Sequence, residues 1–258
     1  MLQNIKEYLS IKGIDGNIIL YRDKQHKKKA LCEYLAEHIV TDKTITCRSS
    51  GAFGLYMAKA FSNNTVEVCG PMTQEYKQQA EKLSNVILIT GVHETSPEST
   101  NVKNHAVEND LYYVNQYGEP LIEEYYKNHF TDIIMELGDI NIDAFCDCGH
   151  SCATLSGAID NELASKWTFI LGVNLDNRCR EHAHYLNVKK DKFIQETTRN
   201  FDTKQIQVDL ENMYPAFGNI FEATRSISAA MSWLQKNPGK TVLVYVGDSP
   251  VFGEDAEI

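Results

Sequence analysis

Short runs of apolar, β-branched and aromatic residues recur along the whole chain, with stretches of helical periodicity between them. Within each run the apolar character is nearly continuous instead of alternating with polar residues, which is typical of strands covered on both faces. The runs lie at 17–21, 44–47, 66–69, 86–89, 111–114, 143–146, 167–173 and 241–246. This order of strands and helices predicts βαβ units and a mostly parallel sheet.

Apolar residues with i, i+4 spacing occupy the stretches between these runs. The predicted helices are 30–39, 55–61, 119–137 and 226–234. Two other stretches, 91–105 and 176–205, lack this spacing and predict loops, the second a mobile flap rich in charged residues, Asn and Lys. The sequence shows no internal repeat and no low-complexity segment.

A chain of 258 residues can form one large domain or two lobes in close contact. The pattern predicts an α/β protein with two lobes, each a mostly parallel twisted sheet with helices on both faces. We expect residues 1–43 and 139–258 to form the larger lobe, with 44–138 inserted as a smaller α/β lobe.

Composition argues against several classes of protein. No apolar run reaches 18 residues, so we expect no membrane span. The N-terminal segment lacks the apolar region of a signal peptide, which predicts a cytoplasmic location. A formal net charge of −10 disfavours a nucleic-acid partner, because phosphate binding favours a basic surface.

The seven cysteines are an odd number and are scattered along the chain. Cys47, Cys69 and Cys146 stand in apolar runs, where a free thiol behaves as a small core residue. We therefore expect no disulfide framework.

In open α/β sheets ligands bind beyond the carboxyl ends of the strands, so the loops after strands are the candidate sites. The first such loop is the basic stretch 24–29, which precedes a predicted helix. The start of a helix favours anions, so lysines there indicate a bound anion, an amine that loses its proton, or a solvated basic surface.

Two further loops between a strand and a helix, 47–54 and 147–154, are rich in small residues. Small residues let backbone amides come close to a ligand, and the first amides of a helix can bind a carboxylate or a phosphate. The second loop also suggests a metal site formed by Cys146, Cys148, His150 and Cys152. Their spacing differs from that of structural zinc ligands, so we expect no metal there.

A second cluster, Cys179, His182 and His184, lies in a polar stretch and is expected to be solvated surface.

Taken in order, these segments resemble the fold type II (tryptophan synthase β-like) pyridoxal-phosphate enzymes, especially cysteine synthase and its 2,3-diaminopropionate synthase-like relatives. Residues 49–54, Ser-Ser-Gly-Ala-Phe-Gly, match that family's Thr-Ser-Gly-Asn-Thr-Gly loop, and 113–117 match its Asn-Gln-Phe/Tyr segment. Residues 150–157 match its Gly-Thr-Gly-Gly-Thr-Ile-Ser-Gly loop, and 247–249 match its last-strand serine. The resemblance extends from about residue 17 to residue 252.

The resemblance implies pyridoxal 5'-phosphate (PLP) as cofactor and assigns residues to two groups of contacts. The substrate carboxylate would be bound by Ser49, Ser50, Gly51, Ala52, Phe53 and Gln116. The cofactor would be bound by Gly149, His150, Ser151, Cys152, Ala153 and Thr154 at its phosphate and by Ser249 at its pyridine nitrogen.

The resemblance also implies a lysine after the first strand that forms a Schiff base with the cofactor. The family's Ser-x-Lys-Asp-Arg context is absent here. Counting helical apolar positions back from Tyr34 and Leu35 favours Lys27, with Lys28 the near rival. The reaction implied is a β-elimination or β-replacement on a serine- or cysteine-derived amino acid, in which the same lysine moves the Cα proton.

Several positions depart from the family's pattern. Ala52 stands where the family has an Asn that contacts the cofactor's ring hydroxyl, and His150, Cys152 and Ala153 replace loop glycines. Thr224-Arg225-Ser226 stands for Ser-Ser-Gly. The alternative is therefore an inactive or repurposed homologue that acts as a binding or partner subunit. Members of this family usually form homodimers, so the resemblance also implies a homodimer.

Overall fold

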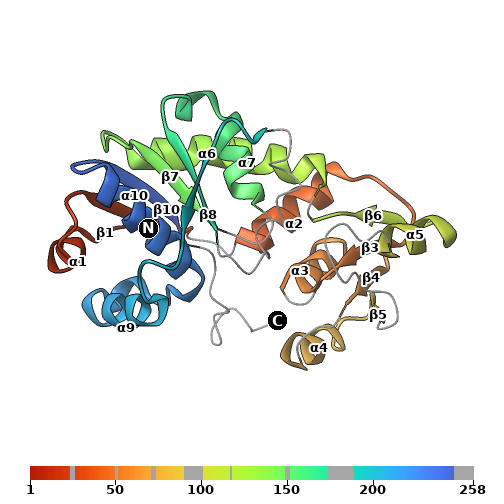
Figure 1. Ribbon diagram of the computed structural model, residues 1–258. Helices are drawn as coiled ribbons and strands as arrows, with labels where there is room; N and C mark the ends of the chain where they lie inside the picture. Colours follow the sequence, from red (N-terminus) through yellow and green to blue (C-terminus); the bar gives the residue numbers. More distant parts are fainter. Residues whose placement is uncertain are drawn as a thin grey trace. The chain divides into compact units, whose positions relative to one another are not determined.

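The computed structural model describes residues 1–23, 27–49, 52–70, 74–89, 101–116, 118–148, 152–173 and 189–246. The chain divides into two compact units, one of residues 1–24 with 126–258 and one of residues 25–125 (Figure 1). The smaller unit begins earlier than the predicted 44–138 insert, because helix α2 (Lys27–His38) packs against α3 (Ala52–Ala60). It ends within helix α6 (Pro120–Leu137) instead of after it.

The larger unit contains a six-stranded sheet in the order β1-β2-β10-β7-β8-β9. Its strands are β1 (Leu2–Asn4), β2 (Asn17–Tyr21), β7 (Ala144–Asp147), β8 (Thr168–Val173), β9 (Ile194–Thr197) and β10 (Thr241–Tyr245). Every neighbouring pair is parallel except β1 with β2. In the register of the central strands, Val244 lies between Leu20 and Cys146.

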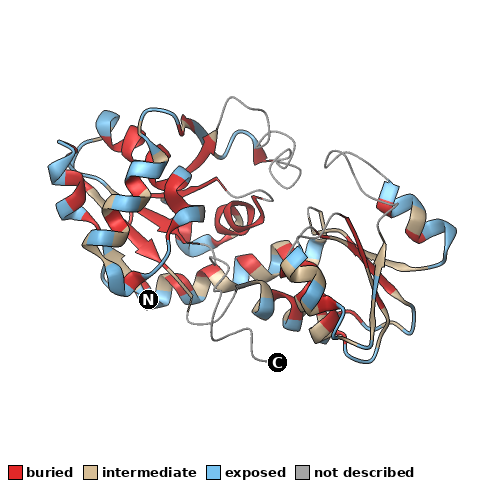
Figure 2. Cartoon of the chain, turned by 90° about the horizontal axis from the view of Figure 1, so that it is seen from below, coloured by how far each residue is buried: buried red, intermediate tan, exposed pale blue. Residues whose placement is uncertain are grey.

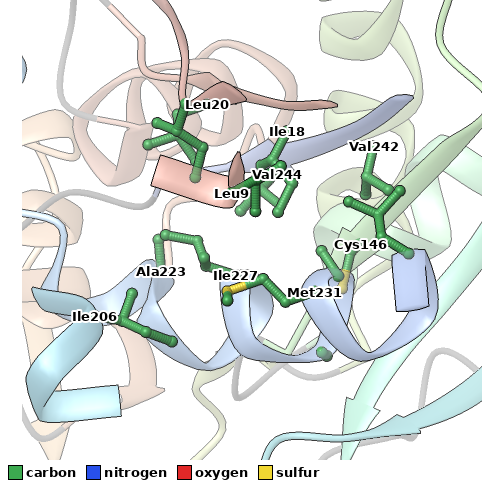
Figure 3. Packing of buried hydrophobic residues seen from close by; sticks show 14 of the residues in the cluster. Leu9, Ile18, Leu20, Cys146, Ile206, Ala223, Ile227, Met231, Val242 and Val244 are labelled. Carbon is green, nitrogen blue, oxygen red and sulfur yellow. The ribbon is translucent and has the colours of Figure 1, made fainter. Parts of the chain in front are cut away.

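Helices cover both faces of this sheet. They are α1 (Lys6–Ile11), α6, α7 (Ala153–Asp160), α9 (Thr203–Met213) and α10 (Thr224–Lys236), with 3-10 turns η1 (Glu162–Ala164), η3 (Pro215–Phe217) and η4 (Phe221–Ala223). Val242 and Val244 pack with α1, α9 and α10 in one core cluster, which Figure 3 shows from close by. Leu243, between them, packs with α6 and α7 in the second cluster. Because successive residues of the central strands β2, β7 and β10 face two different cores, these strands are apolar along most of their length.

The smaller unit contains a four-stranded parallel sheet in the order β5-β4-β3-β6. Its elements are α2, β3 (Ile45–Arg48), α3, β4 (Val66–Cys69), α4 (Gln74–Ala80), β5 (Val86–Ile89), α5 (Asn101–Glu108) and β6 (Tyr112–Val114). Helix α3 approaches β4 through Gly54 and Val68. Helix α5 contacts the same strand through His105, whose Nε2 lies 2.8 Å from a carboxylate oxygen of Glu67. The colouring of Figure 2 places most buried positions on strands and on the inner sides of helices.

The predicted α/β class with mostly parallel sheets is confirmed, but two predicted loops contain regular structure. Helix α5 begins at Asn101, inside the stretch 91–105, and only Val102 and Ala106 of it are buried. Strand β9 and the start of α9 lie inside 176–205. Strand β9 is at the sheet edge, and a half-exposed edge strand carries too few apolar residues for the pattern to reveal it.

In the described part of the chain, no helix is both long enough and apolar enough to pass through a bilayer.

Candidate functional site

The turn between β3 and α3 is held by one of its own side chains and by the neighbouring strand. The amide of Gly54 donates to Oγ of Ser49 at 2.9 Å, and the amide of Ser49 donates to the carbonyl of Cys69 at 3.0 Å. Ser49 is buried, so its hydroxyl oxygen caps the first turn of α3 from inside the unit. Ser50 and Gly51, also predicted to bind the substrate carboxylate, lie outside the described residues.

Two glycines let this turn approach β4. A Cβ at Gly54 would lie 2.5 Å from Cγ1 of Val68. A Cβ at Gly70, where φ is +135°, would lie 2.9 Å from the carbonyl oxygen of Ser49. Neither distance leaves room for a side chain, so the position of the turn depends on both glycines.

The other predicted substrate contacts differ in what they can offer a ligand. Ala52 and Phe53 are buried in the first turn of α3, and the Phe53 carbonyl accepts from Sγ of Cys32 at 3.8 Å. Their side chains therefore belong to the packing of the unit. Gln116 follows β6, the parallel neighbour of β3. The Ser49 turn and Gln116 thus follow the carboxyl ends of adjacent strands.

In the larger unit, the three strands that precede the predicted cofactor and lysine segments are neighbours. Strand β10 lies between β2 and β7, and all three are parallel. Their last residues, Tyr21, Tyr245 and Asp147, therefore end at the same edge of the sheet. Gly149, His150, Ser151 and Ser249, which follow two of these ends, lie outside the described residues.

The lysine stretch leads into a helix, as predicted. Helix α2 begins at Lys27, and its first turn contains no acidic residue. Lys28 is half-buried and Lys29 is exposed. The position of the Lys27 side chain lies outside what the structure describes, as do residues 24–26.

The start of α7 has an unusual backbone. Cys152, the residue before the helix, is left-handed with φ 53° and ψ 14°, and its thiol does not cap the helix. A left-handed residue other than glycine costs about 1–2 kcal/mol, so the surrounding structure must hold it. A left-handed residue followed by helical ones turns successive amides toward one point, which is the geometry of an anion-binding nest.

The side chains at this start point into the protein. Cys152 packs in the core cluster with α6 and α7, and Ala153 and Thr154 are also buried. The Cβ atoms that replace the family's glycines at 152 and 153 are therefore accommodated by the core packing.

Helix α7 is fixed in place on two sides. A Cβ at Gly157 would lie 2.7 Å from the amide nitrogen of Lys127, so α7 packs closely on α6. The buried ammonium of Lys189 donates to Oγ of Ser156 at 2.7 Å and to Asp160 at 2.6 Å. These contacts hold the middle and the end of α7 against α6 and Lys189.

The described cysteines are core residues, as expected of Cys47, Cys69 and Cys146. All six are buried thiols, and burial raises the pKa of the Cys146 thiol well above its ordinary value. The hydroxyl of Ser226 lies 3.1 Å from Sγ of Cys148 and accepts from the Cys148 amide at 3.1 Å. Among described residues, no three His, Cys, Asp or Glu side chains are grouped to hold a metal ion; His150, Cys179, His182 and His184 lie outside them.

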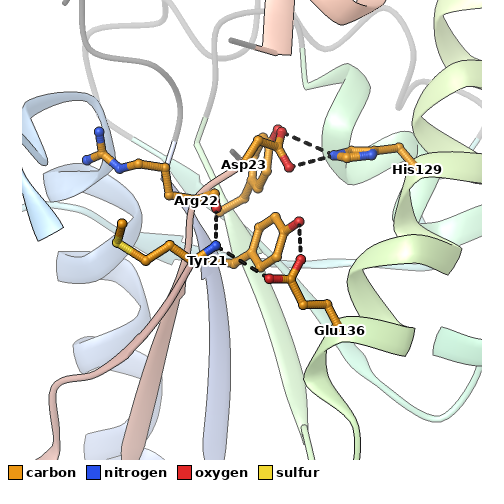
Figure 4. A network of polar contacts seen from close by, with 7 residues as sticks. Tyr21, Arg22, Asp23, His129 and Glu136 are labelled. Carbon is orange, nitrogen blue, oxygen red and sulfur yellow. Dashed lines mark hydrogen bonds and ion pairs between the residues drawn. The ribbon is translucent and has the colours of Figure 1, made fainter. Parts of the chain in front are cut away.

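The sequence did not indicate a polar network beside the end of β2 (Figure 4). Asp23 accepts from Nε2 of His129 at 3.0 and 3.1 Å and from the hydroxyl of Tyr245. The hydroxyl of Tyr21 donates to Glu136 at 3.2 Å. Asp23 is 106 residues from His129 and 222 from Tyr245, so no local pattern could have joined them.

This network changes the ionisation of two of its members. Burial alone would raise the pKa of Asp23, but hydrogen bonds from His129 and Tyr245 lower it below its ordinary value overall. Burial and the adjacent carboxylates of Asp23 and Glu136 raise the pKa of Tyr21. The Tyr21 hydroxyl therefore stays protonated and acts as a donor.

No family model and no curated protein matches this sequence. Solved structures do match. An O-acetylserine-dependent cystathionine β-synthase from Helicobacter pylori matches with a TM-score of 0.75 and 15% identity over 97% of this chain and 92% of that one.

O-acetyl serine sulfhydrylase isoform 3 from Entamoeba histolytica matches with a TM-score of 0.74 and 12% identity, covering 100% of this chain and 88% of that chain. A hydrogen sulfide-producing enzyme from Fusobacterium nucleatum has a TM-score of 0.70 and 15% identity, covering 92% of both chains. The chain has the fold of these enzymes. In this fold type II architecture, the turn after β3 and the start of α7 are the places where the sequence resemblance put the substrate and phosphate loops.

Proposed function

We propose that this chain is a PLP-dependent enzyme that carries out β-elimination or β-replacement on a serine- or cysteine-derived amino acid. The observation that carries the proposal is the left-handed Cys152 at the buried start of α7. Nest geometry at a helix N-terminus suits a phosphate dianion, because amides and helix dipole both favour negative charge. The shared fold and the order of the sequence motifs support the same conclusion.

The described residues at the start of α7 are compatible with the phosphate of PLP. At Cys152 and Ala153 the side chains are taken up by the core, so replacing glycine there does not by itself block the backbone amides. Gly149, His150, Ser151, Cys152, Ala153 and Thr154 would hold the phosphate, and Ser249 would face the pyridine nitrogen.

Bound PLP supplies an electron sink for the electron pair released at Cα of an amino acid. The amine of Lys27, or of its rival Lys28, would take the proton from Cα and return it. The amides of the turn 49–54 and the side chain of Gln116 would bind the substrate carboxylate. The oxygen of Ser49 already accepts a hydrogen bond from the first turn of α3. Ser49 would therefore contribute to carboxylate binding as a hydroxyl donor and by holding the turn in place.

The test is the visible absorbance of purified protein with and without added PLP. We expect a band for the wild-type chain and for Lys29→Ala, which removes an exposed lysine from the same helical turn. Lys27→Ala should abolish the band. Loss of the band in Lys28→Ala alone would reassign the lysine, and a colourless wild-type protein would contradict the proposal.

One observation favours a second function, that of an inactive or repurposed homologue serving as a binding or partner subunit. Ala52 presents a buried methyl group where the family has an amide for the ring hydroxyl, and a methyl group cannot donate a hydrogen bond. Under this alternative the chain associates with a partner enzyme or another anion and remains colourless with PLP. Co-purification of a partner together with that spectrum would favour it.

A further inference from the structure

The Asp23 network lies where the two connections between the units meet the larger unit. The chain passes into the smaller unit after residue 24 and returns within α6 at residue 126. Asp23 is the last described residue before the first connection, and His129 follows the second within one helical turn. Their hydrogen bonds therefore tie the end of β2 to α6 within the larger unit.

The carboxylate of Asp23 is held from two elements. Its side chain is 9% exposed and that of His129 is 17% exposed. Helix α6 provides His129, strand β10 provides the hydroxyl of Tyr245, and the Tyr245 ring stacks on Tyr21 with centroids 5.9 Å apart. Nε2 of His129 must carry a proton to donate to a carboxylate, so its tautomer is defined by this contact.

Two other charged side chains near the network, among the described residues, have partners of their own. Glu136 of α6 accepts from Tyr21 and lies 3.5 Å from the N-terminal ammonium of Met1. The side chain of Arg22 leaves the strand on the opposite face, where it stacks on the ring of Phe217 and donates to the carbonyl of Asn219. The partners that hold Asp23 are thus His129 and Tyr245.

A buried carboxylate contributes little net stability, because the cost of removing its charge from water offsets the hydrogen bonds that it accepts. The hydrogen bonds do fix a direction, because a carboxylate that accepts from several donors has one defined orientation. The network around Asp23 is therefore better suited to positioning the end of β2 than to stabilising the fold.

We infer that Asp23 is a positioning residue: held by His129 and Tyr245, it fixes the end of β2 in the larger unit, the point from which the chain continues to the lysines at 27–29. Backbone hydrogen bonds also hold the chain just before Asp23: the Val246 amide donates to the carbonyl of Tyr21, and the Arg22 amide donates to the carbonyl of Met1. Only residues 24–26 separate Asp23 from Lys27. The inference deepens the proposed function and rests on it only for the role of that lysine.

The first arm of the test needs no cofactor. Limited trypsin digestion of the full chain, mapped by mass spectrometry, measures cleavage after Lys27, Lys28 and Lys29. Each variant is digested at the same interval below its own unfolding midpoint, so that global stability does not decide the result. Loss of a charged hydrogen bond should raise cleavage roughly tenfold in Asp23→Asn and His129→Gln, and less in Tyr245→Phe.

Asp143→Asn is the matched control, because Asp143 also pairs with a lysine, Lys240 at 2.8 Å, but lies at the start of β7 and so at the opposite edge of the sheet. It should digest like wild type. Equal cleavage in wild type and Asp23→Asn would overturn the inference, and so would equal increases in Asp23→Asn and Asp143→Asn.

The second arm separates this inference from the proposed function. In a PLP titration, Asp23→Asn should reach half of its visible absorbance at a roughly tenfold higher PLP concentration than wild type, and Asp143→Asn should match wild type. A colourless wild type would overturn the proposed function, while the digestion would still decide whether Asp23 positions the chain. A coloured wild type with an unchanged Asp23→Asn titration would overturn the inference alone.

Discussion

Two single residues, Gly54 and Cys152, give the candidate turns their shape by opposite means. Gly54 has no space for a side chain, because α3 lies against Val68 at that point. Cys152 carries a side chain in a conformation that glycine adopts more easily, and its thiol is packed in the core. In both cases the backbone is set by neighbours that are distant in sequence.

Gly54→Ala is expected to destabilise the chain by about 1–3 kcal/mol, because its Cβ would meet Cγ1 of Val68 at 2.5 Å. Chemical denaturation measures the change. Val68→Ala removes the colliding atom, so the double variant should lose less stability than the two single variants added together. Simple additivity would show that the turn shifts away instead of packing on Val68.

Asp23 makes stability depend on pH at the acid end. Its folded-state pKa is lowered, so the folded chain binds this proton less tightly than the unfolded chain does. The contribution is complete above the unfolded carboxyl pKa of about 3.9 and is lost as pH falls through the lower folded value. As the pH decreases, the free energy of unfolding should therefore fall less steeply for Asp23→Asn than for wild type. The exposed control Asp139→Asn should follow wild type, and denaturation at several pH values measures both.

At the scale of elements, the strands were more predictable than the short helices. Strands covered on both faces are apolar at every position, and that signal is local. Helices such as α4 and α5 bury one or two residues each, so their apolar spacing is too sparse to detect. The edge strand β9 is polar for a related reason, since two of its four residues are exposed.

Helix α9 offers a test of how one such element begins. The carboxylate of Asp202 accepts from the amides of Lys204 at 2.9 Å and Gln205 at 3.3 Å, which caps the helix. Asp202→Ala should cost about 1 kcal/mol of unfolding free energy, whereas Asp202→Asn keeps an acceptor and should cost little. Equal losses in both variants, measured by urea denaturation, would mean that charge and not capping is responsible.

At the scale of the whole molecule, the fold accommodates a sequence that has little identity to its structural neighbours. The TM-scores of 0.70 to 0.75 accompany identities of 12 to 15%. Fold alone does not define function, so the assignment depends on the chemistry of residues at strand ends.

The sequence resemblance to fold type II enzymes implies a homodimer, and we propose that this chain forms one. Light scattering after size exclusion should then give twice the chain mass of 29.2 kDa. The mass should be independent of PLP if the dimer forms through surfaces outside the site. A mass of one chain at micromolar concentration would contradict this expectation.

By itself, the sequence determined the kind and order of most strands and longer helices, and the small-residue turns after β3 and before α7. These features are encoded by neighbours within a few residues, through apolar periodicity and the conformational needs of small residues. Only the tertiary structure decided that β10 joins β2 to β7, and that Asp23 meets His129 and Tyr245. Those pairings depend on which buried faces pack together over 100 residues or more of chain, and no local pattern records that choice.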